Sequence, residues 1–175
     1  YKFIFAKTGK MDLINPLAEA YAETYTSPED SLLEEVTEYT RTRHSESIML
    51  SGKVQGKILE MISCMLRPTA ILEIGTFTGY SALCLAKGLT PEGHLHTIEL
   101  READSALARS YFDRSPQASQ IISHTGNALD ILPGLSSTWD LVFIDADKPA
   151  YIDYFNLVWF IYYYCIYLKV KTSFF

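Results

Sequence analysis

The stretch AILEIGTFTGYS at residues 70–81 consists of an apolar run, a turn with two glycines and the start of a helical pattern. It predicts a buried strand, a tight turn and a helix, in that order. Glycines in such a turn let a ligand approach the backbone, and free N–H groups at the start of the following helix favour negative charge. The stretch therefore has the geometry of a nucleotide-binding site.

The turn in this stretch differs from the dinucleotide-binding fingerprint, which has glycines at its first, third and sixth positions. Counted from Gly75, the third position is Phe77 and the sixth is Tyr80, so the close approach of a pyrophosphate is blocked. Glu73 would repel a phosphate, whereas it could hold a cationic group such as the ammonium of an amino acid. A nicotinamide-dependent dehydrogenase stays as an alternative because it would share the fold.

Helical and strand-like patterns alternate along the chain. Apolar spacing predicts helices over residues 15–25, 28–43 and 54–65, and the third helix carries Val54, Ile58, Leu59, Ile62 and Met65 on its apolar face. Beyond the opening strand we expect helices at 81–87 and 103–112, a helical turn at 127–132, and strands at 94–100, 120–124 and 139–144. This alternation predicts a doubly wound α/β sheet.

The bulk composition favours one domain. The chain has 175 residues, an apolar fraction of 48% and a formal net charge of −6, so it can build a core and has no general attraction to nucleic acid. We divide the domain (1–175) into N-terminal helices (1–67), an α/β core (68–159) and an atypical tail (160–175).

The sequence has no feature typical of export or membrane insertion. Its three cysteines form no Cys-x-x-Cys pair, which suits inert thiols in a reducing compartment. The apolar residues at positions 1–6 are too few for a secretion signal, and the run at 157–168 is too short for a membrane span. We expect a cytoplasmic protein without a membrane partner.

Polar residues follow every predicted strand of the core. Because the carboxyl ends of parallel strands meet at one edge of a sheet, these residues should converge on one site. Glu99 lies about 20 residues beyond the turn, where a carboxylate can accept hydrogen bonds from both hydroxyls of a ribose. The alternative for Glu99 is an exposed charge at the end of a strand. Gly126, Asn127 and Ala128 follow the next strand.

The segment Asp145-Ala146-Asp147-Lys148 follows the last strand of the core. Asp145 offers the hard oxygen ligand that Mg²⁺ or Ca²⁺ prefers. A partly desolvated Lys148 could take a proton from a hydroxyl group as a general base. The alternative is a surface loop with local ion pairing, which contributes little free energy. His44, in the connection before the third helix, is expected to be a solvated loop side chain.

Two motifs together resemble the cation-dependent O-methyltransferases, the family of caffeoyl-coenzyme A and catechol O-methyltransferases. The first is Glu-x-Gly-x-x-x-Gly at residues 73–79, continued to Ser81, and the second is Phe-Ile-Asp-Ala-Asp-Lys at 143–148 with Tyr151. Residues 49–56 are similar to the segment that covers the cofactor in that family. The resemblance extends over about residues 13–159.

The resemblance implies a Rossmann-like fold of the S-adenosylmethionine-dependent methyltransferases and methyl transfer to a phenolic small molecule, with a divalent cation and a homodimer. Glu73, Gly75 and Ser81 would lie along the methionine part of the cofactor, and Glu99 would hold its ribose. Asp145 would be a metal ligand and Lys148 the catalytic base. The full set of implied cofactor contacts is Met49, Ser51, Glu73, Gly75, Thr76, Phe77, Ser81, Glu99, Leu100, Gly126, Asn127, Ala128, Asp145 and Tyr154.

The tail departs from the family pattern. The family continues with a glycine turn, a further buried strand and an Asp-Asn pair of metal ligands, but residues 160–175 contain no Gly, Asp or Asn. We therefore expect a sheet that is incomplete on its C-terminal side, with a tail strand that could pair beside the strand at 139–144. The alternative to a full enzyme is a truncated fragment that binds S-adenosylmethionine without metal-dependent activity.

Overall fold

The computed structural model describes residues 15–135, 138–159 and 166–168. Its strands are β1 (Ala70–Ile74), β2 (His94–Glu99), β3 (Ile121–Thr125), β4 (Leu141–Ile144) and β5 (Ile166–Leu168). Its α-helices are α1 (Pro16–Tyr25), α2 (Ser31–Arg43), α3 (Lys53–Leu66), α4 (Tyr80–Ala86), α5 (Glu102–Phe112), α6 (Ala128–Ile131) and α7 (Tyr151–Trp159). Short 3-10 turns are η1 (Ser47–Met49), η2 (Ala118–Gln120), η3 (Leu132–Gly134) and η4 (Lys148–Ala150).

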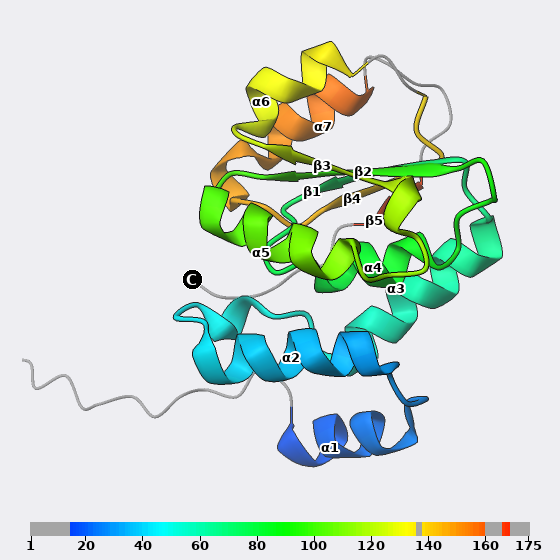
Figure 1. Ribbon diagram of the computed structural model, residues 1–175, viewed down its shortest axis with the longest axis vertical. Helices are drawn as coiled ribbons and strands as arrows, with labels where there is room; N and C mark the ends of the chain where they lie inside the picture. The colour runs from blue at the N-terminus through cyan, green and yellow to red at the C-terminus, as the bar shows by residue number, and fades with distance from the viewer. Residues whose placement is uncertain (1–14, 136–137, 160–165, 169–175) are drawn as a thin grey trace, which may run out of the picture.

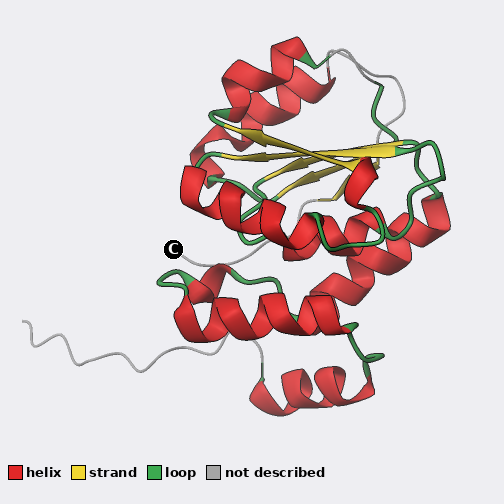
Figure 2. Cartoon of the chain, in the orientation of Figure 1, coloured by secondary structure: helices red, strands yellow, loops and turns green. Residues whose placement is uncertain are grey.

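The five described strands form one parallel sheet in the order β3-β2-β1-β4-β5. The chain moves outward from β1 to β3 and then returns to the other side of β1 with β4, so the order reverses between β1 and β4. Helices cover both faces of this sheet: α6 and α7 lie on one side, and α3, α4 and α5 on the other (Figures 1 and 2). The prediction of a doubly wound α/β fold is confirmed.

Two apolar clusters fill the space between the sheet and its helices. Successive residues of a strand point to opposite faces, so Ile71 packs toward α4 and α5 while Leu72 packs toward α6 and α7. The first cluster also includes Leu33 and Val36 of α2, which attaches the N-terminal helices to the core. Burial on both faces explains why β4 is a continuous apolar run.

Helix α2 begins at Ser31, three residues later than predicted. The Asp30 side chain accepts a hydrogen bond from the Leu33 N–H at 3.0 Å and caps the helix, so Pro28 lies before the helix. Arg114 of the segment after α5 makes two hydrogen bonds of 2.9 Å to the Glu35 carboxylate and adds a surface contact between α2 and the core.

The predicted third helix is confirmed as α3, but two of the apolar residues that marked it do not lie in the core. Ile58 and Met65 are exposed, and the buried residues of the helix are Gly56, Leu59 and Ser63. The reason is close packing against α4, because a Cβ atom at Gly56 would lie 2.7 Å from the Tyr80 ring. Cys64, on the same helix, is exposed, whereas Cys84 is buried and its burial raises the pKa of the thiol to about 12. Cys165 lies outside the described residues.

The tail contributes the strand that the sequence suggested. Ile166, Tyr167 and Leu168 pair in parallel with Leu141, Val142 and Phe143, so β4 is not the edge of the sheet. Residues 157–159, the start of the same apolar run, belong to α7 instead. No helix within the described part of the chain has the length and apolar character needed to cross a membrane.

Candidate functional site

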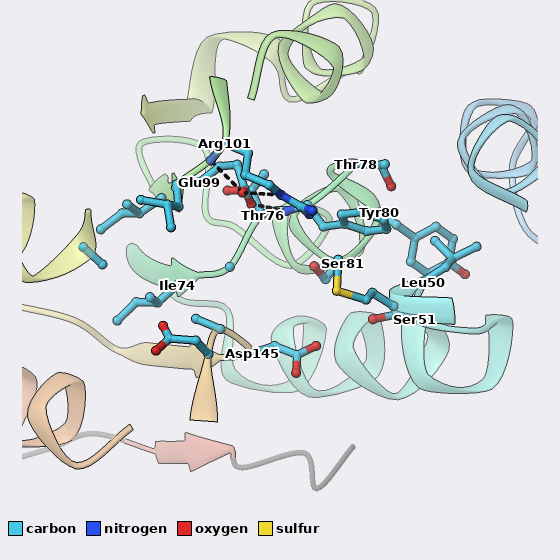
Figure 3. Close-up of a pocket in the computed structure, with 18 of the residues that line it drawn as sticks. Leu50, Ser51, Ile74, Thr76, Thr78, Tyr80, Ser81, Glu99, Arg101 and Asp145 are labelled. Atoms are coloured by element: carbon cyan, nitrogen blue, oxygen red, sulfur yellow. Dashed lines mark hydrogen bonds and ion pairs between the residues drawn. The ribbon is translucent and has the colours of Figure 1, made fainter. Parts of the chain in front are cut away.

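A cavity of about 530 Å³ opens at the carboxyl ends of β1, β2, β3 and β4. Its lining includes the β1–α4 turn, Glu99 after β2, Gly126 to Ala128 after β3, and Asp145 to Lys148 after β4. Residues 48–51, which include the end of η1, line it as well; we call them the covering segment. In Figure 3 labelled side chains from the covering segment, the β1–α4 turn and the ends of β2 and β4 surround one space. A site at the point where the strand order reverses is typical of doubly wound sheets.

The β1–α4 turn requires glycine at its first position. Gly75 has a φ angle of +102°, and a Cβ atom there would lie 2.5 Å from the backbone oxygen of Asp145. Glycine therefore allows the ends of β1 and β4 to meet. Phe77 has a φ of +50°, which is uncommon for a residue other than glycine. Its N–H donates a hydrogen bond of 2.7 Å to Glu99, and this bond holds the turn against β2.

Glu99 is a buried carboxylate that faces the cavity, so the alternative of an exposed strand-end charge is wrong. It accepts hydrogen bonds from the backbone N–H groups of Phe77 at 2.7 Å and Arg101 at 3.0 Å. A carboxylate has about four acceptor sites. Glu99 therefore keeps acceptor capacity for hydroxyl groups of a ligand.

Glu73 differs from the other implied cofactor contacts because it does not line the cavity. It is fully buried, and its carboxyl group accepts hydrogen bonds from the hydroxyls of Ser81, at 2.6 Å, and Thr97. Burial raises the pKa of Glu73 to about 8, against the opposing effect of these two hydrogen bonds. Its direct contact is with Ser81, which does line the cavity, rather than with the cavity itself.

The end of β3 is shaped by a glycine and a helix cap. Gly126 has a φ of +140°, and its N–H donates to the Glu99 backbone oxygen at 2.8 Å. The Asn127 side chain accepts a hydrogen bond from the Leu129 N–H at 3.0 Å and caps α6. These contacts place Gly126, Asn127 and Ala128 on the cavity wall.

At the end of β4, Asp145 is half-buried, and desolvation raises the pKa of its carboxyl group. Asp147 is exposed and accepts a hydrogen bond of 2.7 Å from the Tyr154 hydroxyl of α7. Burial and this bond raise the pKa of Tyr154. Lys148 lines the cavity but is exposed, so the expected partial desolvation of its amine is not found.

The described residues do not provide a complete metal site. No group of three or more His, Cys, Asp or Glu side chains suited to a metal ion occurs among them. Asp145 is a suitable oxygen ligand, and Asp147, which accepts one hydrogen bond from Tyr154, keeps further acceptor sites. Within the described part of the chain these two carboxylates are fewer than the three side chains of such a group.

Two polar side chains beside the cavity, Arg101 and His44, were not assigned to the site from the sequence. Arg101 lines the cavity, 3.6 Å from Glu99 and 5.4 Å from the centre of the Phe77 ring. His44 contacts the same ring edge-on, with 4.6 Å between ring centres, and its side chain is only 14% exposed. The expectation of a solvated His44 is therefore wrong. Arg101 could have been assigned to the site because it lies two residues after Glu99. No residue near His44 in the sequence indicates that His44 lies beside the site.

Comparison with protein families gives an independent result. A family model described as O-methyltransferase matches residues 22–161, which is most of the chain and includes all the strand ends that line the cavity.

Curated relatives carry related names. The chain is 41% identical over 106 residues to the catechol O-methyltransferase of Niastella koreensis, covering 58% of this chain and 48% of the relative. It is 39% identical over 101 residues to the catechol O-methyltransferase of Mycobacterium tuberculosis, covering 57% of this chain and 46% of the relative. Caffeoyl-CoA O-methyltransferase 1 of Eucalyptus globulus is 30% identical over 127 residues, covering 70% of this chain and 51% of the relative. The chain thus spans about half the length of these relatives.

Solved structures agree in fold. The O-methyltransferase TomG of Streptomyces achromogenes, solved with S-adenosylmethionine, matches with a TM-score of 0.77 and 32% identity, covering 83% of this chain and 66% of that one. An O-methyltransferase of Bacillus cereus, solved with S-adenosylhomocysteine, matches with a TM-score of 0.74 and 32% identity, covering 83% of this chain and 67% of that one. The fold is therefore the Rossmann-like fold of S-adenosylmethionine-dependent methyltransferases. Because the O-methyltransferase family model matches residues 22–161 and the curated relatives are named O-methyltransferases, this chain belongs to the O-methyltransferase family.

Proposed function

We propose that the cavity binds S-adenosylmethionine and that the protein transfers its methyl group to a hydroxyl of a catechol-like or caffeoyl-type phenolic acceptor. The observation that carries this proposal is the convergence of four strand ends and the covering segment on one cavity, with Glu99 buried at its wall. The resemblance to solved O-methyltransferases bound to S-adenosylmethionine or S-adenosylhomocysteine supports the choice of cofactor.

Each part of the cofactor has a candidate partner on the cavity wall. Glu99 would accept hydrogen bonds from the ribose hydroxyls, and Asn127 and Ala128 would border the adenine. The Ser81 hydroxyl and the open backbone at Gly75 would lie along the methionine part, beneath Met49 and Ser51 of the covering segment. Phe77 occupies the place of the third fingerprint glycine, which supports this cofactor over a nicotinamide dinucleotide.

The acceptor would lie at the end of β4, where Asp145 and Lys148 line the cavity. Bound S-adenosylmethionine would supply the methyl group: the phenolic oxygen would take the methyl carbon as the carbon–sulfur bond breaks and its electron pair returns to sulfur. Lys148, the base that the family resemblance implies, would take the phenolic proton in its neutral amine form. Orientation of the two reactants is central to such a displacement and can contribute about 7–11 kcal/mol in favourable cases.

A divalent cation enters the proposal with Asp145 as its protein ligand. The Asp145 carboxylate would bind Mg²⁺ or Ca²⁺, but the described residues do not complete the site. Because the described residues do not complete a metal site, the alternative function is cofactor binding without metal-dependent activity.

Isothermal titration with S-adenosylmethionine, with and without Mg²⁺, followed by a methyl-transfer assay on catechol, distinguishes the two functions. Binding with a methylated product supports the proposed enzyme, and a product that forms only with Mg²⁺ supports the cation at Asp145. Binding without product supports the fragment, and absence of binding contradicts both.

The Glu99→Gln variant tests the ribose contact. A hydrogen bond to a charged group contributes about 1.5–3 kcal/mol, so we expect the dissociation constant for S-adenosylmethionine to rise about tenfold or more. Glu92→Gln, in the exposed loop before β2, is the matched control and should bind as the parent does. Equal affinity of Glu99→Gln and the parent would remove Glu99 from the cofactor site.

A further inference from the structure

His44 joins two parts of the chain, the end of α2 and helix α5. It is the residue that ends α2, and its Nε2 atom lies 2.9 Å from Oδ1 of Asp104 in α5. Its Nδ1 atom accepts a hydrogen bond of 3.1 Å from the Glu46 N–H. We call these three residues the His44 latch.

One form of the histidine ring satisfies both contacts of the latch. Because Nδ1 accepts a hydrogen bond, it carries no proton, so the proton of the neutral ring lies on Nε2 and is donated to Asp104. The ring therefore donates a hydrogen bond to α5 and accepts one from the backbone that follows α2.

The α5 side of the latch leads to Glu99. Asp104 is buried and is also paired with Arg101, whose Nε atom lies 2.7 Å from Oδ2. Arg101 in turn contacts Glu99 and lies over the Phe77 ring, and His44 contacts the same ring. A continuous set of contacts therefore runs from the end of α2 to the carboxylate at the cavity wall.

The other side of the latch leads to the covering segment. Glu46 directly precedes η1, and residues 48–51 line the cavity, whereas His44 itself does not. The two hydrogen bonds of His44 thus fix the backbone from which the covering segment starts, relative to α5 and the end of β2.

We propose that His44 is a positioning residue for cofactor binding: through Asp104 and the Glu46 N–H it holds the covering segment and the Phe77 ring in their places at the cavity wall. This inference rests on the proposed function, because the cavity is taken as the cofactor site. It adds a role for a residue that contacts neither cofactor nor acceptor.

The first test compares the His44→Ala variant with the parent by amide hydrogen exchange and by titration with S-adenosylhomocysteine. We expect faster exchange at Glu46 and through residues 47–51, with the interior of α2 unchanged, because only the start of the covering segment loses its tie. The dissociation constant should rise about tenfold, which corresponds to about 1.4 kcal/mol. In a methyl-transfer assay the KM for the cofactor should rise more than kcat falls.

Two variants separate the latch from general damage to the fold. His94→Ala removes an exposed histidine at the amino end of β2 and should match the parent in exchange and affinity. His44→Asn keeps an acceptor within reach of the Glu46 N–H, as in an Asx turn, but is too short to reach Asp104. It should restore protection at Glu46 while affinity stays low, and it replaces His44→Ala as the test if the alanine variant does not fold.

A double-mutant cycle with Asp104→Ala identifies the partner. Residues that act through one contact are non-additive, so adding His44→Ala to Asp104→Ala should weaken binding much less than it does in the parent. Additive losses would overturn the proposal, as would unchanged exchange and affinity in His44→Ala. If the parent itself fails to bind S-adenosylhomocysteine, the proposed function fails, and the exchange of residues 46–51 alone then decides whether the latch exists.

Discussion

Glu73 is the residue whose environment departs most from that of a free carboxyl group. Burial raises its pKa from an ordinary 4.5 to about 8, so the folded protein binds this proton more tightly than the unfolded chain does. Stability from this group is then fully present below about pH 4.5 and is lost as the pH rises through 8.

We therefore predict that the free energy of unfolding of the parent falls between pH 5 and pH 8 relative to that of Glu73→Gln, which stays uncharged. The difference should exceed about 1 kcal/mol, the free energy of roughly one pKa unit. Urea unfolding at a series of pH values measures it, with Glu92→Gln as the control that should follow the parent. Parallel curves for the parent and Glu73→Gln would show that Glu73 does not titrate in this range.

The place of a single residue at the site was predictable from the sequence where that residue directly follows a strand. Gly75 and Glu99 were identified from spacing alone, because the turn and the strand fix their positions. His44 was not, since its partner Asp104 is 60 residues away in the chain and no local pattern connects them. The contacts of Glu73 within the protein could not be predicted either, because its two hydroxyl donors come from α4 and β2.

At the scale of elements, the contact between α3 and α4 places Tyr80 at the cavity. Gly56 lies against the Tyr80 ring and near Sγ of Cys84, so any larger side chain must displace them. Tyr80 also donates a hydrogen bond to Glu29, in the connection before α2. The small residues of α3 thus set the position of a cavity-lining side chain on another helix.

The Gly56→Val variant should lower the free energy of unfolding by about 1–3 kcal/mol, the usual cost of overpacking. It should also weaken binding of S-adenosylhomocysteine, because Tyr80 shifts. Chemical unfolding and calorimetric titration measure the two effects. Met65→Val, at a position of the same helix that is 76% exposed, introduces the same side chain without the clash and should change both quantities far less. Similar losses in both variants would argue against the close packing.

The positions of the helices and strands were largely predictable from the sequence, whereas the buried side of a helix such as α3 was not. Each predicted strand of the core exists within one or two residues, because apolar runs and strand-end glycines are strong local signals. The apolar periodicity of α3 correctly included Leu59, but it also pointed to Ile58 and Met65, which are exposed, and it did not indicate Gly56 and Ser63, which are buried. Packing through small residues leaves no hydrophobic pattern to read.

The whole molecule leaves apolar side chains exposed on two helices of its N-terminal part. Helix α1 has no buried residue and lies farthest from the sheet in Figure 1. The exposed large apolar side chains of these helices are Leu17, Tyr21 and Tyr25 on α1, and Ile58, Met61 and Met65 on α3. A homodimer, which the family resemblance implies, would remove part of this surface from water.

We predict that light scattering gives a mass about twice the 19.8 kDa of one chain. Tyr21→Lys should lower the dimer fraction, because a charge then replaces an apolar contact. Glu19→Lys, at an exposed position of the same helix, is the control and should leave the mass unchanged. A parent protein that is monomeric at all concentrations would contradict the dimer.

The His44 latch also bears on the order in which the molecule folds. Its partners are separated by the whole of α3, β1, α4 and β2, so the contact closes a long loop and comes at a cost in chain entropy that local contacts avoid. The central strands must pair before Asp104 is in place to receive His44. The sheet is therefore expected to form early in folding. The ability to enclose a cofactor is expected to arise late, when the N-terminal helices dock onto the core that has already formed.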